Sequence, residues 1–318
     1  MNKIPKLIFN NEILDRRADL RNHKCAKSYL SCKEALNIVF FNELPLISSN
    51  GNHTRLTYLL HDHWLLKFVN LSVFLGLYRG KSVYAHNIST DQLGLRKQAP
   101  TEYLKNELQK DPLMTNTDFK DLRTNLTIMP EDDSNLAGTG RNLIQWNLNN
   151  RFCGKCGLSL SLKNFGWEAR CEKCNRSYFP RTDPVVIILI TSGNKTLLGR
   201  SNQFPEKLYS CLAGFIEPGE TIEMAARREV QEEVGIKIHD IEYIANQPWP
   251  FPSSLMIGLR ARTNQETLDI DKNELEDALW VTKKELKNVL NGDCDSILPA
   301  RTGTIARHLL ESWALGEI

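Results

Sequence analysis

Four charged side chains lie close together in one short stretch of the chain: Arg228, Glu229, Glu232 and Glu233. Offsets of three and four residues place the three glutamates on one face of a helix. Like charges on one face destabilise a helix unless a counter-charge is present, and a divalent cation supplies one. Oxygen ligands with open, water-filled positions suit Mg²⁺ or Mn²⁺, which also bind phosphate oxygens. The spacing therefore favours a magnesium or manganese site over the alternative, a salt-bridged surface helix.

The helix that carries these glutamates has a recognisable beginning and end in the sequence. Pro218 and Gly219 predict a turn, Thr221 can cap the first helical turn, and Gly235 can end the helix. Arg228 can pair with a neighbouring glutamate and fix its orientation. The other faces carry apolar residues for packing, namely Ile222, Ala225, Ala226, Val230 and Val234.

Two C-x2-C pairs separated by fourteen residues form a second group with metal-binding chemistry. Their members are Cys153, Cys156, Cys171 and Cys174. This spacing is typical of tetrahedral zinc, and Gly154, Gly157 and Asn175 favour the tight turns that bring two thiolates to one ion. Four sulfur ligands leave no open position, so we expect one structural zinc per chain rather than a catalytic one.

A stiff segment rich in proline follows the glutamate helix. It consists of Gln247, Pro248, Trp249, Pro250, Phe251, Pro252, Ser253 and Ser254. Prolines restrict the backbone and lower the entropy lost on binding, while Trp249 and Phe251 offer flat faces for a nucleobase or a nicotinamide ring. The alternative is that the two aromatic rings fill the core of the domain.

The elements around these groups predict an α+β module followed by a sheet-containing domain. Residues 1–110 mix helical patches with strand-like runs such as 65–77. The polar stretch 111–133 reads as a linker or loop, and a domain boundary is expected near it. Helical spacing over 136–149 leads into the cysteines, and the apolar run 185–190 predicts a buried strand.

Composition sets the broad class of the protein. The chain has 318 residues and a net charge of +2, so we expect about two soluble domains and no global field that recruits nucleic acid or membranes. There is no membrane-spanning or signal-like run, which indicates a cytoplasmic protein. Four of the eight cysteines are clustered, which favours metal over disulfides, and Cys211 is expected to be buried.

The segment from Gly214 to Ile236 resembles the Nudix box, G-x5-E-x7-R-E-U-x-E-E-x-G-U, where U is aliphatic. Every fixed position is met, by Gly214, Glu220, Arg228, Glu229, Val230, Glu232, Glu233, Gly235 and Ile236. The resemblance implies an α/β/α sandwich with a mixed sheet, in which the box forms a loop, a helix and a loop. It also implies hydrolysis of a nucleoside diphosphate that is linked to a second moiety.

Further motifs are similar to the NADH pyrophosphatase subfamily, which also removes NAD caps from RNA. The segment 247–254 resembles the SQPWPFPxS signature of that subfamily, with Asn246 in place of serine. The cysteine ribbon, the segment 178–184 and the helix beginning at Thr304 also match. The specific match covers residues 145–318 and is weak over the N-terminal half.

The resemblance also implies roles for individual residues. It assigns catalysis to Glu229, Glu232, Glu233 and Arg228, and Mg²⁺ or Mn²⁺ binding to the three glutamates with Glu274 and Ala213. It assigns substrate binding to residues 247–254 together with Ala213, Phe179 and Ala306. One position departs from the family, because Gly166 stands where an acidic residue of the ribbon contacts the substrate. Direct contact between the ribbon hairpin and the substrate is therefore in doubt.

The resulting hypothesis is an enzyme that splits NAD(H) into nicotinamide mononucleotide and AMP, with NAD-capped RNA as a further substrate. We expect three parts, an α+β domain at 1–134, a helix and zinc ribbon at 135–180, and a Nudix domain at 181–318. The resemblance implies a homodimer. The alternatives are a Nudix hydrolase of ADP-ribose or another nucleotide, and a zinc-ribbon nucleic-acid adaptor with an inactive Nudix fold.

Overall fold

The computed structural model describes residues 7–30, 32–51, 53–89 and 100–318. Contacts between residues divide the chain into two compact units. The C-terminal unit contains residues 7–10 together with 182–249 and 254–318, and the N-terminal unit contains the described residues of 11–181 and 250–253. The C-terminal unit is therefore formed by a short N-terminal segment of the chain together with its C-terminal part.

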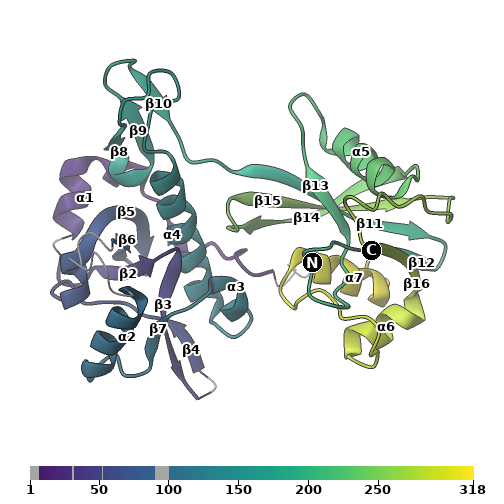
Figure 1. The fold of residues 1–318 in the computed structure, drawn as a ribbon, viewed down its shortest axis with the longest axis horizontal. Helices are drawn as coiled ribbons and strands as arrows, with labels where there is room; N and C mark the ends of the chain where they lie inside the picture. Colours follow the sequence, from purple (N-terminus) through teal and green to yellow (C-terminus); the bar gives the residue numbers. More distant parts are fainter. Residues whose placement is uncertain (1–6, 31, 52, 90–99) are drawn as a thin grey trace. The chain divides into compact units, whose positions relative to one another are not determined.

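The C-terminal unit is built on a mixed β-sheet with strand order β14-β15-β11-β12-β16 (Figure 1). β11 pairs with β15 in parallel, and β13 pairs antiparallel with the first half of β11. The strands are β11 Asp183–Ser192, β12 Lys195–Arg200, β13 Leu212–Phe215, β14 His239–Trp249, β15 Ser254–Arg262 and β16 Asp277–Thr282. The helices are α5 Ile222–Val234, α6 Lys283–Asn291 and α7 Ile305–Leu315.

Helices cover both faces of this sheet, which explains the continuous apolar run in β11. Val186, Ile188 and Ile190 point to the core beneath α5, whereas Ile187 and Leu189 point to the core beneath α6 and α7. Successive strand residues face opposite sides, so a strand that is covered twice has no polar face. The predicted buried strand and the predicted layered fold with a mixed sheet are confirmed.

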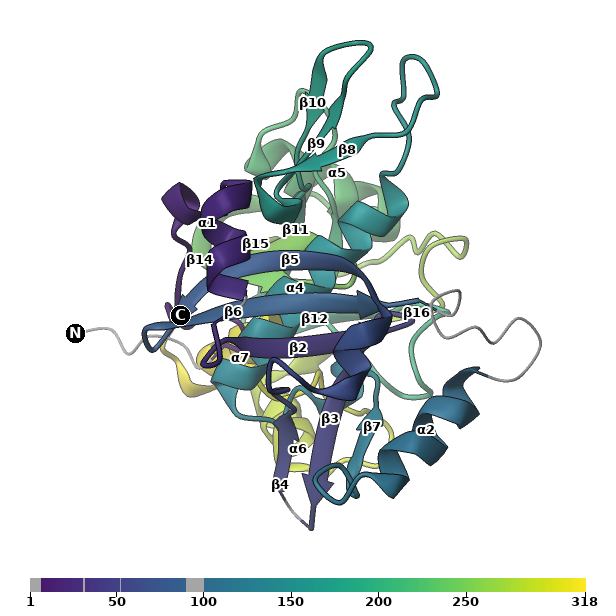
Figure 2. The same ribbon diagram turned by 90° about the vertical axis from the view of Figure 1, so that its left-hand side faces the viewer.

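The N-terminal unit holds a second mixed sheet with strand order β1-β5-β6-β2-β3-β4, and β7 pairs with β3. β2 and β6 are parallel, and β5, β6 and β2 lie side by side in Figure 2. The bounds are β1 Leu14–Asp15, η1 Ala18–Arg21, α1 His23–Leu30, β2 Leu36–Phe41, β3 Leu44–Asn50, β4 His53–Leu56, η2 Trp64–Phe68, β5 Val69–Tyr78, β6 Lys81–Ile88, α2 Pro100–Lys110, β7 Thr117–Phe119, α3 Leu122–Asn125 and α4 Glu131–Asn149.

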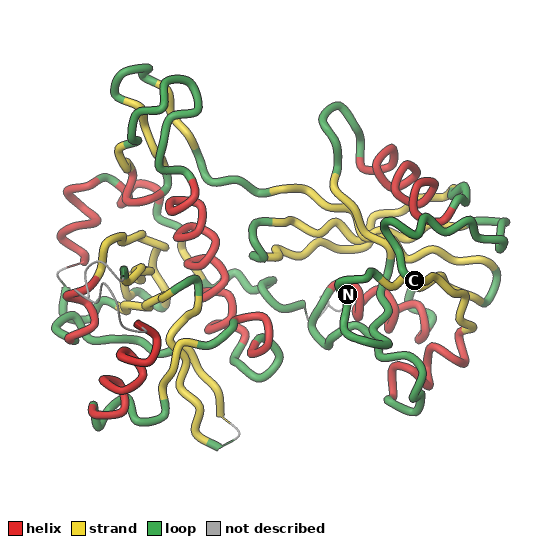
Figure 3. The backbone as a smooth tube through the Cα atoms, viewed as in Figure 1, coloured by secondary structure: helices red, strands yellow, loops and turns green. Residues whose placement is uncertain are grey.

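α4 packs closely on the sheet of the N-terminal unit and leads into the ribbon. A Cβ at Gly140 would lie 2.9 Å from the Cβ of Ala85, so glycine allows the close approach of helix and sheet. The ribbon then forms a three-stranded hairpin structure, seen as short strands joined by loops in Figure 3. Its elements are β8 Ser161–Lys163, η3 Asn164–Gly166, β9 Glu168–Cys171 and β10 Arg176–Tyr178.

The structure corrects two details of the sequence analysis. The stretch 111–133 is not a linker, because it contains β7, α3 and the start of α4, with Phe119 and Leu122 buried. Leu126 and Met129 are buried as well, whereas Leu113 and Ile128 are exposed. The stretch therefore packs through a few apolar residues although its average composition is polar. The expected strand 65–77 begins as the 3-10 helix η2 and becomes β5 only at Val69.

Contacts group the ribbon with the N-terminal unit. The division into three domains at residues 134 and 180 remains a prediction. None of the helices in the described part of the chain is long and apolar enough to cross a membrane.

Candidate active site and metal centres

α5 begins and ends where the sequence predicted. The Thr221 hydroxyl accepts a hydrogen bond from the Met224 amide at 3.2 Å, which satisfies an amide of the first turn. Gly235 ends the helix in the left-handed conformation, with a φ of 71°. Ala225, Val230 and Val234 are fully buried beneath the helix. This packing fixes the rotation of α5 and therefore the direction of its glutamates.

Three carboxylates meet at this helix. Oxygen atoms of Glu229, Glu233 and Glu274 all lie within 4.8 Å of one another. Glu274 comes from the loop before β16, and that loop is tied to the end of α5 by hydrogen bonds from Asp271 N to Glu233 O and from Asp269 N to Val234 O, each 3.0 Å long. The structure therefore brings together residues that are about forty positions apart, including the Glu274 that the resemblance singled out.

Gly214 provides the space for one of these carboxylates. A Cβ at this position would lie 1.9 Å from Cδ of Glu229, which is far inside van der Waals contact. Gly214 lies on β13, where it pairs with Val186 of the central strand β11. Because both the strand and the helix are packed in the core, neither can move away to admit a side chain. The glycine of the motif is therefore required by the position of Glu229.

Arg228 holds a network of carboxylates beside this cluster. Its guanidinium contacts Glu220 at 2.7 Å, Glu229 at 2.8 Å and Glu232 at 3.0 Å, and it donates to the Phe215 carbonyl at 2.8 Å. The predicted pairing of Arg228 is confirmed. Glu232 is exposed and pairs with Arg228, and it does not belong to the group formed by Glu229, Glu233 and Glu274.

Burial makes the carboxylates of α5 difficult to ionise. Glu233 is 7% exposed and one of its oxygens has no hydrogen-bond partner. Desolvation, followed by repulsion from Glu229 and Glu274, raises the pKa of Glu233 to about 8. Desolvation also raises the pKa of Glu229. In contrast, hydrogen bonds from Arg228 lower the pKa of Glu220 to about 2.

This donor set fits a hard divalent cation. Converging carboxylate oxygens, a buried oxygen without a partner and raised pKa values are the features expected where a cation is the missing counter-charge. Glu229, Glu233 and Glu274 are the described residues that would hold it. Ala213, which the resemblance also assigned to metal, lies next to Gly214 on β13 and pairs with Ile187.

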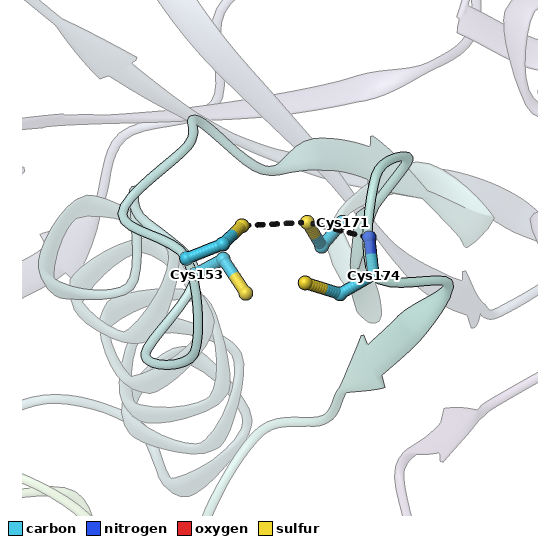
Figure 4. Close-up of side chains that lie close together, drawn as sticks. Cys153, Cys171 and Cys174 are labelled. Atoms are coloured by element: carbon cyan, nitrogen blue, oxygen red, sulfur yellow. Dashed lines mark hydrogen bonds between the residues drawn. The ribbon is translucent and has the colours of Figure 1, made fainter.

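The four ribbon cysteines also converge, from two turns that face each other (Figure 4). Sγ of Cys156 lies 3.5 Å from Sγ of Cys171, which is too long for a disulfide bond. The Cys174 amide donates to Sγ of Cys171 at 3.4 Å. Gly157 and Asn175 adopt the left-handed backbone conformation, with φ values of 72° and 53°, in the tight turns that the sequence predicted. The geometry suits a tetrahedral metal site.

All eight cysteines lie among the described residues and all are free thiols. Cys211 is 5% exposed in the core beneath α7, which confirms its predicted burial. One contact was not anticipated, because the Tyr178 hydroxyl lies 3.2 Å from Sγ of Cys153. No feature of the spacing between these two residues predicts that contact.

Gln247, the first residue of the proline-rich segment, does not face solvent. Its side chain is fully buried, donates to the carbonyls of Ile8 and Gly303 at 2.8 Å each, and accepts from the Ile305 amide at 2.8 Å. Gln247 therefore joins the start of the chain to α7 within the C-terminal unit. Its predicted substrate contact stays a prediction.

The two aromatic rings of the segment belong to different units. Trp249 meets Phe9 edge to face, with ring centroids 6.4 Å apart. Phe251 belongs to the N-terminal unit, where the guanidinium groups of Arg123 and Arg141 lie 4.8 and 5.1 Å from its ring. Both rings are half-buried. Sequence analysis missed these two arginines, because no local pattern links them to Phe251.

The rest of the segment is anchored through backbone atoms. Arg141 donates to the Pro250 carbonyl at 2.6 Å and Asn142 donates to the Pro252 carbonyl at 3.1 Å. The Phe251–Pro252 peptide bond is cis. Pro248 and Pro252 are exposed, whereas Ser253 and Ser254 are half-buried. The segment is thus ordered by contacts in each unit separately.

Other predicted substrate residues differ in accessibility. Phe179 is 62% exposed after the ribbon, whereas Ala306 is 6% exposed in α7. Gly166 is buried with a φ of 92°, and a Cβ there would lie 2.8 Å from a methyl group of Val73. An acidic side chain would not fit at this position without a rearrangement, so the departure from the family pattern is built into the packing.

Two family models match the chain. Residues 180–298 match the NUDIX domain, and residues 34–146 match the NADH pyrophosphatase-like rudimentary NUDIX domain. The first match contains α5 and its glutamates, and the second contains the sheet of the N-terminal unit except β1, together with most of α4.

Curated relatives cover most of the chain. A human NAD-capped RNA hydrolase, NUDT12, is 33% identical over 347 residues, which cover 96% of this chain and 72% of that protein. The NAD-capped RNA hydrolase NudC of Pseudomonas aeruginosa (strain LESB58) is 40% identical over 166 residues, which cover 52% of this chain and 56% of that protein. A NUDIX hydrolase crystal structure from Nitrosomonas europaea shares 22% identity with a TM-score of 0.42, covering 52% of this chain and 93% of that one.

Proposed function

Because the chain belongs to the Nudix hydrolases of the NADH pyrophosphatase type, we propose that it hydrolyses the diphosphate bridge of NAD(H). The products are nicotinamide mononucleotide and AMP. The observation that carries this proposal is the carboxylate group of Glu229, Glu233 and Glu274 at the Nudix helix. The names of the human and Pseudomonas relatives support removal of NAD caps from RNA by the same chemistry.

We propose a separate role for each residue of this site. Glu229, Glu233 and Glu274 would hold Mg²⁺ or Mn²⁺, and Glu232 would complete the set after leaving Arg228. A bound divalent cation would neutralise the diphosphate and lower the pKa of an attacking water. Arg228 orients Glu229 through the contact at 2.8 Å, and Gly214 leaves the space that this carboxylate needs. These roles explain why the motif combines glycine, arginine and glutamate.

Substrate recognition falls to residues outside α5. We propose that Trp249, Ala213 and Ala306 of the C-terminal unit contact the nucleoside and diphosphate parts of the substrate, with the Trp249 ring stacking on a base. Phe251 and Phe179 of the N-terminal unit are separate candidates for stacking. Aromatic rings stack on either the nicotinamide or the adenine ring, because stacking does not require a particular base. The buried Gln247 would act by holding the segment in place rather than by contacting the substrate.

A substrate panel tests the proposal. Purified protein with Mg²⁺ or Mn²⁺ is incubated with NADH, NAD⁺, ADP-ribose, ATP and NAD-capped RNA, and products are identified by chromatography and mass spectrometry. We expect AMP and reduced nicotinamide mononucleotide from NADH. A preference of more than tenfold for ADP-ribose over NADH would support a different Nudix specificity. No hydrolysis of any substrate would support the adaptor hypothesis, and the Glu233→Gln variant controls for contaminating activity.

Three further properties belong to the proposal. The ribbon cysteines would hold one Zn²⁺ per chain, since their sulfur donors suit that ion. The resemblance supports a homodimer, which sedimentation of the purified protein would show. We also propose a cytoplasmic location, as expected from the sequence, which imaging of the tagged protein in its own cell would test.

A further inference from the structure

Two arginines and one tryptophan form a cluster on the N-terminal unit, outside the site described above. Arg16 precedes η1, Arg21 is its last residue, and Trp167 follows η3 at the start of the ribbon hairpin. Cζ of Arg21 lies 3.6 Å from the centroid of the Trp167 ring, and Cζ of Arg16 lies 5.8 Å from it. The elements are far apart in the sequence, so only the fold brings these side chains together.

The positive charge of this cluster is not balanced by a carboxylate. Within the described part of the chain, no carboxylate lies within 4.0 Å of the nitrogen atoms of Arg16 or Arg21, and Nε of Arg21 is buried without a hydrogen-bond partner. The nearby acidic groups have other partners, since Asp19 pairs with Arg17 at 2.7 Å and Glu168 accepts from Asn164 at 2.8 Å.

The two guanidinium groups carry like charges and repel each other. Burial, followed by the charge of Arg16, lowers the pKa of Arg21. This repulsion destabilises the arrangement of two guanidinium groups beside one ring. Attraction to the electron-rich face of the indole offsets the destabilisation only in part. An anion that contacts both guanidinium groups would remove the remaining repulsion between them.

The Trp167 ring is fixed in position, so the cluster is preorganised. Its indole Nε1 donates to the Phe74 carbonyl of β5 at 2.7 Å. The preceding Gly166 packs directly on Val73, and its backbone carbonyl accepts from Asn147 of α4 at 2.9 Å. The tryptophan therefore cannot swing away from the arginines without disturbing the junction between the ribbon and the sheet.

We propose that Arg16, Arg21 and Trp167 bind a single-stranded RNA chain, with the arginines contacting phosphates and the stacked Arg21 and Trp167 planes supporting a base. Guanidinium groups bind phosphate through two parallel hydrogen bonds, and bases stack on both indole rings and arginine planes. The inference rests on the proposed function, because NAD-capped RNA is the substrate that carries such a chain. The cluster would then distinguish capped RNA from free NADH.

Binding of an uncapped RNA tests the cluster without any hydrolysis. A fluorescein-labelled single-stranded RNA of fifteen nucleotides is titrated by anisotropy from low to moderate salt. We expect Arg21→Ala to weaken binding about tenfold, as for the loss of one stacking platform. The slope of log Kd against log salt should fall by about 1 for each arginine removed. Arg16→Ala, at an exposed position, should weaken binding in the same direction.

Arg79→Ala is the matched control on the same unit. Arg79 also lies over an aromatic ring, 4.9 Å from the centroid of Tyr78, but it has a carboxylate partner in Asp132 at 3.0 Å. Wild-type RNA affinity in this variant, together with losses in Arg16→Ala and Arg21→Ala, would support the proposal. Wild-type affinity in both cluster variants would overturn it.

A second ligand separates RNA binding from simple attraction to anions. Inorganic polyphosphate offers the same charge without bases, so equal competition by polyphosphate at matched phosphate concentration would overturn the assignment to RNA. In steady-state assays, the ratio of kcat/KM for NAD-capped RNA to that for NADH should fall in Arg21→Ala. If wild-type protein hydrolysed neither substrate, the proposed function would fail, while the anisotropy titration would still decide on the cluster.

Discussion

The three glutamates of the Nudix helix have different surroundings although they come from one motif. Glu233 is buried without a partner for one oxygen, Glu229 is buried against Gly214 and Arg228, and Glu232 is exposed and paired. Their offsets in the sequence predicted a shared helical face but not this gradation. The loop that carries Glu274 covers the end of α5 near Glu233, and this cover accounts for the different burial of the three glutamates.

Replacing the most buried carboxylate tests its part in catalysis. Glu233→Gln keeps the size of the side chain but removes the charge that would hold a cation. We expect kcat for NADH to fall by roughly 10² to 10⁴, with a smaller change in KM, because charge stabilisation acts mainly on the transition state. Double variants with Glu229→Gln should be less than additive, since both residues serve one cluster.

A glutamate of the same helix outside the cluster provides the control. Glu223 is exposed and accepts a hydrogen bond from the Thr221 hydroxyl at 2.9 Å. Glu223→Gln should change helix capping slightly and leave turnover near the wild-type rate. If Glu233→Gln hydrolysed NADH at the wild-type rate under limiting Mg²⁺, the proposed metal cluster would have to be abandoned.

At the scale of elements, local motifs were predictable and long-range partners were not. The caps of α5, the buried strand β11 and the left-handed ribbon turns follow from short patterns whose physics is local. The burial of Gln247 and the arginines around Phe251 depend on residues more than fifty positions away. The packed stretch 111–133 was misread as a linker because its apolar residues are few and widely spaced.

The ribbon offers an element whose stability should depend on one ion. Cys171 is fully buried and its sulfur lies 3.5 Å from that of Cys156. Cys171→Ser should lose zinc and lower the Tm of the N-terminal unit, because metal binding contributes folding free energy. Metal analysis and thermal unfolding measure both effects. Cys294→Ser, at a half-buried cysteine outside the ribbon, should keep one zinc and the wild-type Tm. A full zinc content in Cys171→Ser would contradict the assignment.

At the scale of the whole molecule, each of the two units carries its own candidate sites. The C-terminal unit carries the carboxylates of α5, and the N-terminal unit carries the ribbon and the cluster of Arg16, Arg21 and Trp167. Each unit has its own mixed sheet with one parallel pair of strands. The stability of the C-terminal unit includes the cost of burying Glu233 and Glu229.

This cost predicts how pH affects the folding of the metal-free protein. The pKa of Glu233 is about 8 in the folded state against an ordinary value of 4.5, so between these values the folded state binds more protons than the unfolded state. The free energy of unfolding of the C-terminal unit should therefore fall as pH rises from about 4.5 to about 8, by an amount on the order of a few kcal/mol. Glu220 affects the free energy of unfolding in a different pH range, because its lowered pKa changes stability only below pH 4.5.

Urea unfolding in the presence of a chelator for Mg²⁺, at a series of pH values from 5 to 8, measures this dependence. Glu233→Gln should flatten the curve and be more stable than wild type near pH 8, because it has no proton to lose. Added Mg²⁺ should also reduce the loss of stability in wild type, since a cation offers the ionised carboxylates their missing partner. If metal-free wild type kept the same free energy of unfolding across this range, Glu233 would have to ionise near its ordinary pKa. Burial would then not be the reason that the site requires a cation.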